Sequence, residues 1–326
     1  MIRVLITSAS RKVWLIKAFQ RALSEEGGGE VMAVDSDPKS AALYVADKGY
    51  LVPLGLGEDF LRAILGICQK HAVKLVVPTR DEELSVLAAA KPRLQDIHVT
   101  VMASDPDVIE VCQDKRLFVE FCLENGFSVP KTYKAADIET ISEFPIFVKE
   151  RFGKGSKRTF VAESRKDLAY LLGRLKDPII QEYINAMEYT VDLFADFSGE
   201  VISVVPRERL SVFGGETFVG RTRKNWEIIR ASICLARRLK LKGHNTIQCF
   251  LHHGVVKFIE VNPRYGGGAN LSFSAGAFTP LYLIRLLQGK PLKPAIGEFE
   301  EGCTMLRYTQ DIFTREPEMS QVERLS

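Results

Sequence analysis

The chain has 326 residues, 46% of them apolar and 26% charged, with 44 Lys and Arg against 41 Asp and Glu. A chain of this length builds two or three domains with buried cores, and the composition excludes a disordered or low-complexity protein. The net charge of +3 is too small to predict a nucleic-acid surface. Because no apolar run reaches membrane-span length and the N-terminus shows no leader pattern, we expect a cytoplasmic protein with neither nucleic-acid nor membrane partners.

The cysteines are scattered, without a CxxC pair or histidines at zinc-site spacing, so we expect buried free thiols. They are Cys68, Cys112, Cys122, Cys234, Cys249 and Cys303.

The first hundred residues alternate short β-branched runs with amphipathic stretches, which is typical of a parallel sheet with crossover helices. The predicted strands are Ile2 to Thr7, Val31 to Asp35, Leu75 to Thr79 and Val99 to Ala103. Asp105 followed by Pro106 predicts the N-cap and first residue of a new helix, and we place the first domain boundary there.

From Phe144 onward the pattern changes to glycine-interrupted strands, which predicts an α+β region. A hairpin is expected around the loop Gly153 to Lys157, and an amphipathic helix at Trp226 to Leu239. Further strands are predicted at Ile179 to Tyr183, Glu188 to Phe197, Val201 to Val205, Thr246 to Leu251, Val255 to Val261 and Cys303 to Tyr308.

The first strand runs into Thr7 to Ser10, where a dinucleotide site would need G-x-G-x-x-G. Those glycines are missing, which argues against a nicotinamide dehydrogenase and favours a turn-capping role for Asp35. For the segment Thr79 to Glu83, helix capping is favoured over substrate contact.

The loop Gly153 to Lys157 is not a P-loop, because G-x-x-x-x-G-K-[ST] is absent and the segment joins two strands. Its glycines allow close backbone approach and its lysines supply charge to a polyphosphate. By itself the loop fits an exposed hairpin turn equally well.

The segment from Lys257 to Arg264 carries the clearest chemical pattern. Alternation along a strand places Glu260 and Asn262 on one face, with Gln248 on the preceding strand, and such oxygen ligands suit Mg²⁺. Arg264 is expected to continue that face, followed by a flexible loop, Tyr265 to Asn270, that could close over a substrate. The alternative is a surface strand with an ion pair between Glu260 and Arg264.

Taken in order, these motifs resemble the ATP-grasp superfamily, and within it the synthetase domains of the carbamoyl phosphate synthetase large subunit. The motifs are Asp114-Lys115, Phe147-Val148-Lys149, the glycine loop, Gln181-Glu182-Tyr183-Ile184 and Glu260-Val261-Asn262-Pro263-Arg264. The resemblance implies a mixed α/β and α+β fold. A Rossmann-like parallel-sheet pre-ATP-grasp domain at 1–105 would precede an ATP-grasp domain at 106–295, with a lid subdomain at about 130–182. Residues 296–326 would form a C-terminal strand and a polar tail.

The resemblance also implies residue roles. Lys115 and Lys149 would reach the nucleotide phosphates, although Lys115 alone would also fit a solvated helix lysine. The lid loop would be Gly153, Lys154, Gly155, Ser156 and Lys157. The adenine and ribose would be held by Gln181, Glu182, Tyr183, Ile184 and Glu188. Gln248, Glu260 and Asn262 would bind Mg²⁺ or Mn²⁺, and Arg264 would act with Lys149 in catalysis by steadying the transferred phosphate. For Arg207, Arg209 and Arg221, a carboxylate-binding role and structural salt bridges are equally supported.

The resemblance therefore implies a ligase that uses Mg-ATP to convert a small carboxylate to an acylphosphate and joins it to an amine or similar nucleophile, possible as a homodimer. The alternative is a non-catalytic ATP-binding subunit or a partial carbamoyl phosphate synthetase-like component. The lysine-bearing loop and the Tyr-Gly-Gly-Gly-Ala-Asn run after Arg264 depart from that synthetase, which implies a different acyl donor or acceptor.

Overall fold

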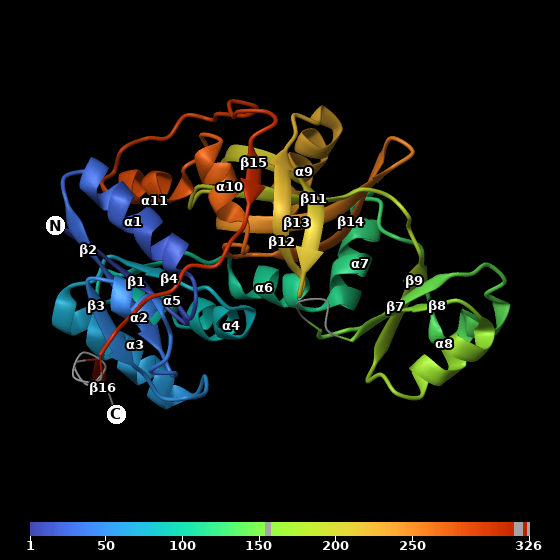
Figure 1. Ribbon diagram of the computed structural model, residues 1–326, viewed down its shortest axis with the longest axis horizontal. Helices are drawn as coiled ribbons and strands as arrows, with labels where there is room; N and C mark the ends of the chain where they lie inside the picture. The colour runs from blue at the N-terminus through green and yellow to red at the C-terminus, as the bar shows by residue number, and fades with distance from the viewer. Residues whose placement is uncertain (154–157, 316–321, 325–326) are drawn as a thin grey trace.

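The computed structural model describes residues 1–153, 158–315 and 322–324. They form three sheets arranged along the long axis of the molecule (Figure 1). In these ranges no helix has the length and apolar character needed to cross a membrane.

The N-terminal unit is a parallel sheet flanked by helices, as the alternating sequence pattern predicts. Its elements in chain order are β1 (Ile2–Ile6), α1 (Val13–Glu25), β2 (Gly29–Asp35), α2 (Ala42–Val45), β3 (Lys48–Leu51), α3 (Glu58–His71), β4 (Leu75–Val77), α4 (Asp81–Ala89), α5 (Lys91–Gln95) and β5 (Thr100–Val101). The strand order is β16-β3-β2-β1-β4-β5, with β16 (Glu323–Arg324) added from the far end of the described chain. Strands β1, β2 and β4 are buried on both faces, which explains their continuous apolar sequences.

Two helices lead out of the N-terminal unit: α6 (Pro106–Gln113) and α7 (Lys115–Glu124). Asp105 is the N-cap residue and Pro106 the first residue of α6, as predicted, but the Asp105 side chain makes no capping hydrogen bond. The Asp105 carboxylate instead pairs with Lys91 at 2.9 Å and with Lys242 at 2.7 Å, because two ammonium groups compete for it. Asp114 does cap α7, accepting hydrogen bonds from the backbone N–H groups of Arg116 and Leu117.

The small sheet is antiparallel and projects from one end of the molecule with a hydrophobic core of its own (Figure 1). It contains β6 (Thr132–Tyr133), the 3-10 helix η1 (Ala135–Thr140), β7 (Ile146–Glu150), β8 (Thr159–Ala162), α8 (Arg165–Leu172) and β9 (Pro178–Glu182). The predicted hairpin is confirmed as β7 and β8. Its basic tip, Lys154 to Lys157, lies outside the described residues.

The central sheet is antiparallel, in the order β14-β13-β10-β11-β12-β15. Its elements are β10 (Glu188–Ala195), β11 (Val201–Phe213), β12 (Glu216–Thr222), α9 (Trp226–Leu239), β13 (Gly243–His252), β14 (Val255–Asn262), α10 (Ala269–Ser274), α11 (Thr279–Leu287) and β15 (Thr304–Leu306). Helix α9 covers one face of the sheet, and its Asn225 side chain accepts the N–H of Ile228 at the N-cap.

The segment after Arg264 is packed, and the prediction of a flexible loop from Tyr265 to Asn270 is wrong. Tyr265 is fully buried, with its ring stacked on His244 at a centroid distance of 4.1 Å, and α10 begins at Ala269. A Cβ on Gly268 would lie 2.6 Å from Nη1 of Arg207, so this glycine is required by close approach. The chain then continues into α11, which shares a hydrophobic core with α1 and lies beside it (Figure 1).

The thiols follow the prediction only in part. Cys68, Cys112, Cys122 and Cys249 are buried, whereas Cys234 is exposed on α9 and Cys303 is half-buried.

Candidate active site

A single large cavity of about 1980 Å³ lies where the three sheets meet. It is lined by every described candidate residue from the sequence: Lys115, Lys149, Gly153, Gln181, Glu182, Tyr183, Ile184, Glu188, Gln248, Glu260, Asn262 and Arg264. The structure therefore brings together residues that are separated by up to half the chain.

The strands β13 and β14 place the oxygen donors side by side. Gln248 lies directly opposite Glu260, and Asn262 follows on the same face of β14. The Asn262 Nδ2 atom donates to Glu260 Oε1 at 3.1 Å and lies 3.5 Å from Gln248 Oε1. The Glu260 carboxylate and the Gln248 amide oxygen thus converge on the Asn262 side chain, whose own Oδ1 faces Arg264. These three side chains supply oxygen donors of the kind that suit a hard cation such as Mg²⁺.

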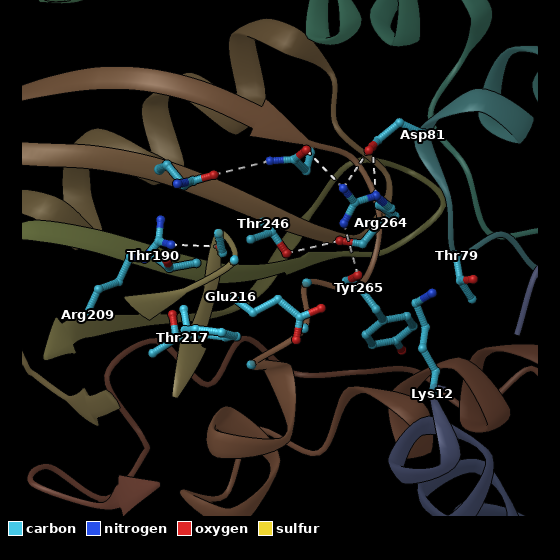
Figure 2. Close-up of a pocket in the computed structure, with 18 of the residues that line it drawn as sticks. Lys12, Thr79, Asp81, Thr190, Arg209, Glu216, Thr217, Thr246, Arg264 and Tyr265 are labelled. Carbon is cyan, nitrogen blue, oxygen red and sulfur yellow. Dashed lines mark hydrogen bonds and ion pairs between the residues drawn. The ribbon is translucent and has the colours of Figure 1, made fainter. Parts of the chain in front are cut away.

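Arg264 closes this end of the hairpin but does not pair with Glu260, so the alternative of a Glu260–Arg264 ion pair is wrong. Its guanidinium forms a bidentate ion pair with Asp81 at the start of α4, with Nε–Oδ1 and Nη2–Oδ2 distances of 2.7 and 2.5 Å. Nη2 also donates to Asn262 Oδ1 at 3.2 Å. Arg264 is consequently fixed next to the convergent oxygen donors (Figure 2).

The two candidate phosphate lysines are both buried. Lys115, the first residue of α7, donates to the carbonyl of Gly153 at 2.6 Å, so it is not a solvated helix lysine. Lys149 lies on β7, and burial lowers its pKa to about 8; Glu260 and Glu188 oppose this effect, while the charge of Lys115 adds to it. Two ammonium groups held in one partly dry site favour a polyanionic ligand.

Strand β9 supplies the opposite end of the cavity. Glu182 accepts hydrogen bonds from Lys257 Nζ at 2.6 Å and from the Lys131 N–H at 2.7 Å. Gln181 is buried and donates to Thr132 Oγ1, whereas the Tyr183 ring is exposed to the cavity. Burial raises the pKa of Glu182, but Lys257 and the Lys131 N–H outweigh it, so this carboxyl is more acidic than usual.

The arginines of the central sheet form ion pairs. Arg207 pairs with Asp192 (Nε–Oδ2 2.7 Å), Arg209 with Glu188, and Arg221 with Glu208. Glu188 also accepts a hydrogen bond from Gln248 Nε2 at 2.7 Å. Glu188 therefore connects Arg209 to the oxygen donors. Arg221 does not line the cavity, so a carboxylate-binding role for it is wrong.

Arg207 and Arg209 each have one buried guanidinium nitrogen without a hydrogen-bond partner among the described residues. The Arg207 side chain is 1% exposed, and its unpartnered nitrogen is Nη1. Burial raises the pKa of Asp192, but the Arg207 charge and His244 outweigh this and hold it well below its usual range. The pair is thus fully charged, with a donor left beside Gly268.

The sequence reasoning missed several cavity residues. Lys12, at the start of α1, points into the cavity toward Arg264 (Figure 2). Asp81 holds Arg264, and Glu216 pairs with Arg307 after β15. Asp81 belongs to the segment Thr79 to Glu83, whose strand-end position leaves substrate contact open as the alternative to helix capping. Its neighbour Glu83 caps α4 as predicted, and Asp35 accepts the turn N–H groups of Ser10 and Asp37.

The fold and the cavity resemble those of ATP-grasp proteins, and comparisons with known proteins agree. Residues 4–102 match the PylC-like N-terminal domain, and residues 174–310 match the family described as ATP-grasp in the biosynthetic pathway with Ter operon. Over residues 174–310 the chain is therefore similar to ATP-grasp proteins.

Among individual proteins, the chain is similar to carbamoyl phosphate synthase large chains. It is 24% identical to that of Pyrococcus furiosus over 293 residues and 26% identical to that of Clostridium beijerinckii over 320 residues. These alignments cover 82% and 91% of this chain but 28% of each relative, so the chain spans little more than a quarter of their length.

Solved structures share the fold. The biotin carboxylase domain of Hydrogenobacter thermophilus 2-oxoglutarate carboxylase, whose structure holds MgADP, ADP and bicarbonate, superposes with a TM-score of 0.75 at 15% identity, covering 93% of this chain and 73% of that one. N5-carboxyaminoimidazole ribonucleotide synthetase from Thermotoga maritima superposes with a TM-score of 0.65 at 21% identity. That superposition covers 90% of this chain and 77% of the synthetase chain.

Proposed function

We propose that this chain is an ATP-dependent ligase that activates a small carboxylic acid as an acylphosphate and joins it to an amine or similar nucleophile. The observation that carries the proposal is the convergence, in one cavity, of two buried lysines, three oxygen donors and a fixed arginine. Transfer of a γ-phosphoryl group needs positioning and charge neutralisation rather than a protein nucleophile, and this set supplies both.

The residues have the following proposed roles. Lys115 and Lys149 hold the nucleotide phosphates, and the backbone at Tyr183 and Ile184, with Gln181, Glu182 and Glu188, holds the adenosine. Gln248, Glu260 and Asn262 hold Mg²⁺, or Mn²⁺ in its place. The metal would balance charge on the β- and γ-phosphates during transfer. Lys154, Gly155, Ser156 and Lys157 continue the phosphate loop that begins at Gly153.

The chemistry balances without a further reactant. A carboxylate oxygen attacks the γ-phosphorus and the bond to the bridging oxygen breaks, which releases ADP. The amine nitrogen then attacks the acyl carbon, phosphate leaves, and the amine proton passes to solvent. Arg264 stays close to the transferred group through both steps.

Domain limits at 105 and 295 are part of the same proposal, with the small sheet as the moving lid. The biotin carboxylase domain of Hydrogenobacter thermophilus 2-oxoglutarate carboxylase was solved as a dimer, which supports a homodimer here. The short coverage of the carbamoyl phosphate synthase large chains supports one alternative, a single synthetase unit that needs a partner.

The test is ADP release from Mg-ATP by the purified chain across a panel of carboxylic acids, with hydroxylamine present to trap acylphosphate as hydroxamate. Acid-dependent ADP release with hydroxamate formation is expected. A rise in melting temperature with Mg-ATP, but no turnover with any acid, would support the binding-subunit alternative.

A further inference from the structure

One wall of the cavity comes from the N-terminal unit, at the carboxyl ends of its strands. The chain runs from β1 outward to β2 and β3 on one side, then crosses back to β4 on the other side of β1, so the strand order reverses at β1. This switch point is where open parallel sheets bind ligands. The loops are fixed to each other: the Ala42 N–H donates to Ser10 O at 3.0 Å, and Thr79 Oγ1 donates to the carbonyls of Thr7 and Ser8 at 2.8 Å.

Arg80, Asp81 and Glu82 line this wall after β4, whereas the part of it that follows β1 and β2 is lined by positive charge alone. Its charged lining residues between positions 10 and 45 are Arg11, Lys12, Lys17 and Lys39. Among the described residues, none of these four side chains has an ion pair within 4.0 Å. The first turn of α1, at Val13 and Trp14, lines the same wall and adds the positive end of a helix dipole.

The acidic groups nearest to Lys12 are already engaged. Asp81 is held by Arg264, and Glu216 by Arg307. Glu83 accepts from Ser8 Oγ at 2.6 Å and from the Thr79 N–H at 2.6 Å. Lys12 therefore faces the cavity without a dedicated counter-ion, and burial together with the charge of Arg264 lowers its pKa. An anion between Lys12 and Arg264 would relieve this repulsion.

We propose that the wall formed by Arg11, Lys12, Lys17 and Lys39 binds a second anionic group of the carboxylic acid, so that the acid activated by this protein carries at least two negative charges. The proposal rests on the proposed function, which places the reacting carboxylate beside Arg264. Lys12 is the specificity-determining residue, because its side chain points toward Arg264 (Figure 2). The second group is a carboxylate or a phosphate ester, which share the same charge-assisted hydrogen bonding.

The test compares acids that differ only in the second charge. L-glutamate is paired with L-glutamine, L-aspartate with L-asparagine, succinate with succinamate, and 3-phosphoglycerate with glycerate, all at constant ionic strength. Melting temperature with Mg-ATP and rate of ADP release are measured for the wild type, Lys12→Met, Lys12→Arg and Lys74→Met. Lys74 is an exposed lysine just before β4, at the amino ends of the strands and thus at the opposite end from the cavity wall, so its variant loses the same charge away from the cavity.

We expect at least one dianion to exceed its monoanionic partner in both measurements. The apparent affinity for that dianion should fall about tenfold or more in Lys12→Met. Lys12→Arg should retain part of the preference and Lys74→Met all of it. The carboxylate and phosphate pairs show which second group is bound.

Equal responses to both members of every pair, or a preference that survives in Lys12→Met, would overturn the proposal. Failure of Mg-ATP itself to raise the melting temperature of the wild type would instead contradict the proposed function, because that measurement involves no acid.

Discussion

Arg264 and Asp81 form a bidentate ion pair across 183 residues of sequence, and this pair connects the central sheet to the N-terminal unit at the cavity. Both side chains are largely buried, with 20% and 11% of their surface exposed. The position of Arg264 beside the proposed reacting groups therefore depends on how the central sheet and the N-terminal unit pack against each other.

Asp81→Asn is expected to destabilise the protein by about 3 kcal/mol, because it leaves the Arg264 guanidinium partly buried without its counter-charge. Urea unfolding measures the loss, and a cycle with Arg264→Gln and the double variant isolates the coupling between the two residues. Additive losses would show that the pair contributes nothing beyond its separate contacts.

Glu260→Gln should reduce the rate of magnesium-dependent ATP turnover about 100-fold or more, because the only carboxylate among the three oxygen donors is lost. The fold should persist, because Glu260 is only half-buried and a glutamine oxygen can accept the same hydrogen bond from Asn262 Nδ2. The measurement is ADP release together with the melting-temperature rise on adding Mg²⁺ to the ATP-bound protein. Glu163→Gln, an exposed carboxylate after β8, is the matched control. Full activity in Glu260→Gln would contradict the metal assignment.

The lowered pKa of Lys149 predicts that the stability of the protein depends on pH. Its folded pKa of about 8 lies below its ordinary value of 10.5, so the unfolded chain binds the proton more tightly between these limits. The ligand-free protein should therefore gain stability as pH rises from 8 to 10.5, and Lys149→Met should be more stable than the wild type at pH 7 by ~1–3 kcal/mol.

The nucleotide should show the opposite trend, because phosphates favour the charged ammonium. Affinity for Mg-ATP should fall above pH 8 in the wild type, and the Met variant should lack that slope while binding ATP more weakly throughout. Titration calorimetry at several pH values checks both points. A pH-independent wild-type affinity would show that Lys149 does not face the phosphates.

Gly268→Ala should destabilise the protein by about 1–3 kcal/mol, because its Cβ would lie 2.6 Å from Nη1 of Arg207, a side chain that its ion pair holds in place. Gly267→Ala is the control, since its Cβ would meet only the movable carboxylate of Glu216 at 3.3 Å. Thermal unfolding of both variants measures the difference, and equal melting temperatures would refute the close-packing argument.

Local patterns were sufficient to predict much of the fold. Helix α9 has the predicted bounds, Trp226 to Leu239, because a strong apolar stripe and an Asn225 cap act together. Strand β3 was missed, since Lys48–Leu51 is four residues long, contains a glycine and carries no alternation. The glycine run after Arg264 was misinterpreted because sequence does not distinguish a glycine needed for bending from one needed for packing against Arg207.

The candidate site shows the same division. The Glu260 and Asn262 pair follows from strand alternation, and its neighbour Gln248 from a hairpin in register. The partner of Arg264 could not be predicted, because Asp81 meets it only through the docking of two sheets. Lys12 was overlooked for a related reason: nothing in its own neighbourhood indicates that the wall it occupies faces the central sheet.

Strand β16 has a consequence for folding during synthesis. It pairs in parallel with β3 at the edge of the N-terminal sheet, through Glu323 beside Tyr50, and Lys70 holds Glu323 from the helix before β4. While the ribosome is still making the central sheet, the N–H and C=O groups along that side of β3 have no strand to pair with. Exposed strand edges recruit other chains. Truncation before residue 322 should therefore leave the edge of the N-terminal sheet exposed and make folding of the protein depend on chaperones. The described residues that line the cavity would still be present in such a truncated chain.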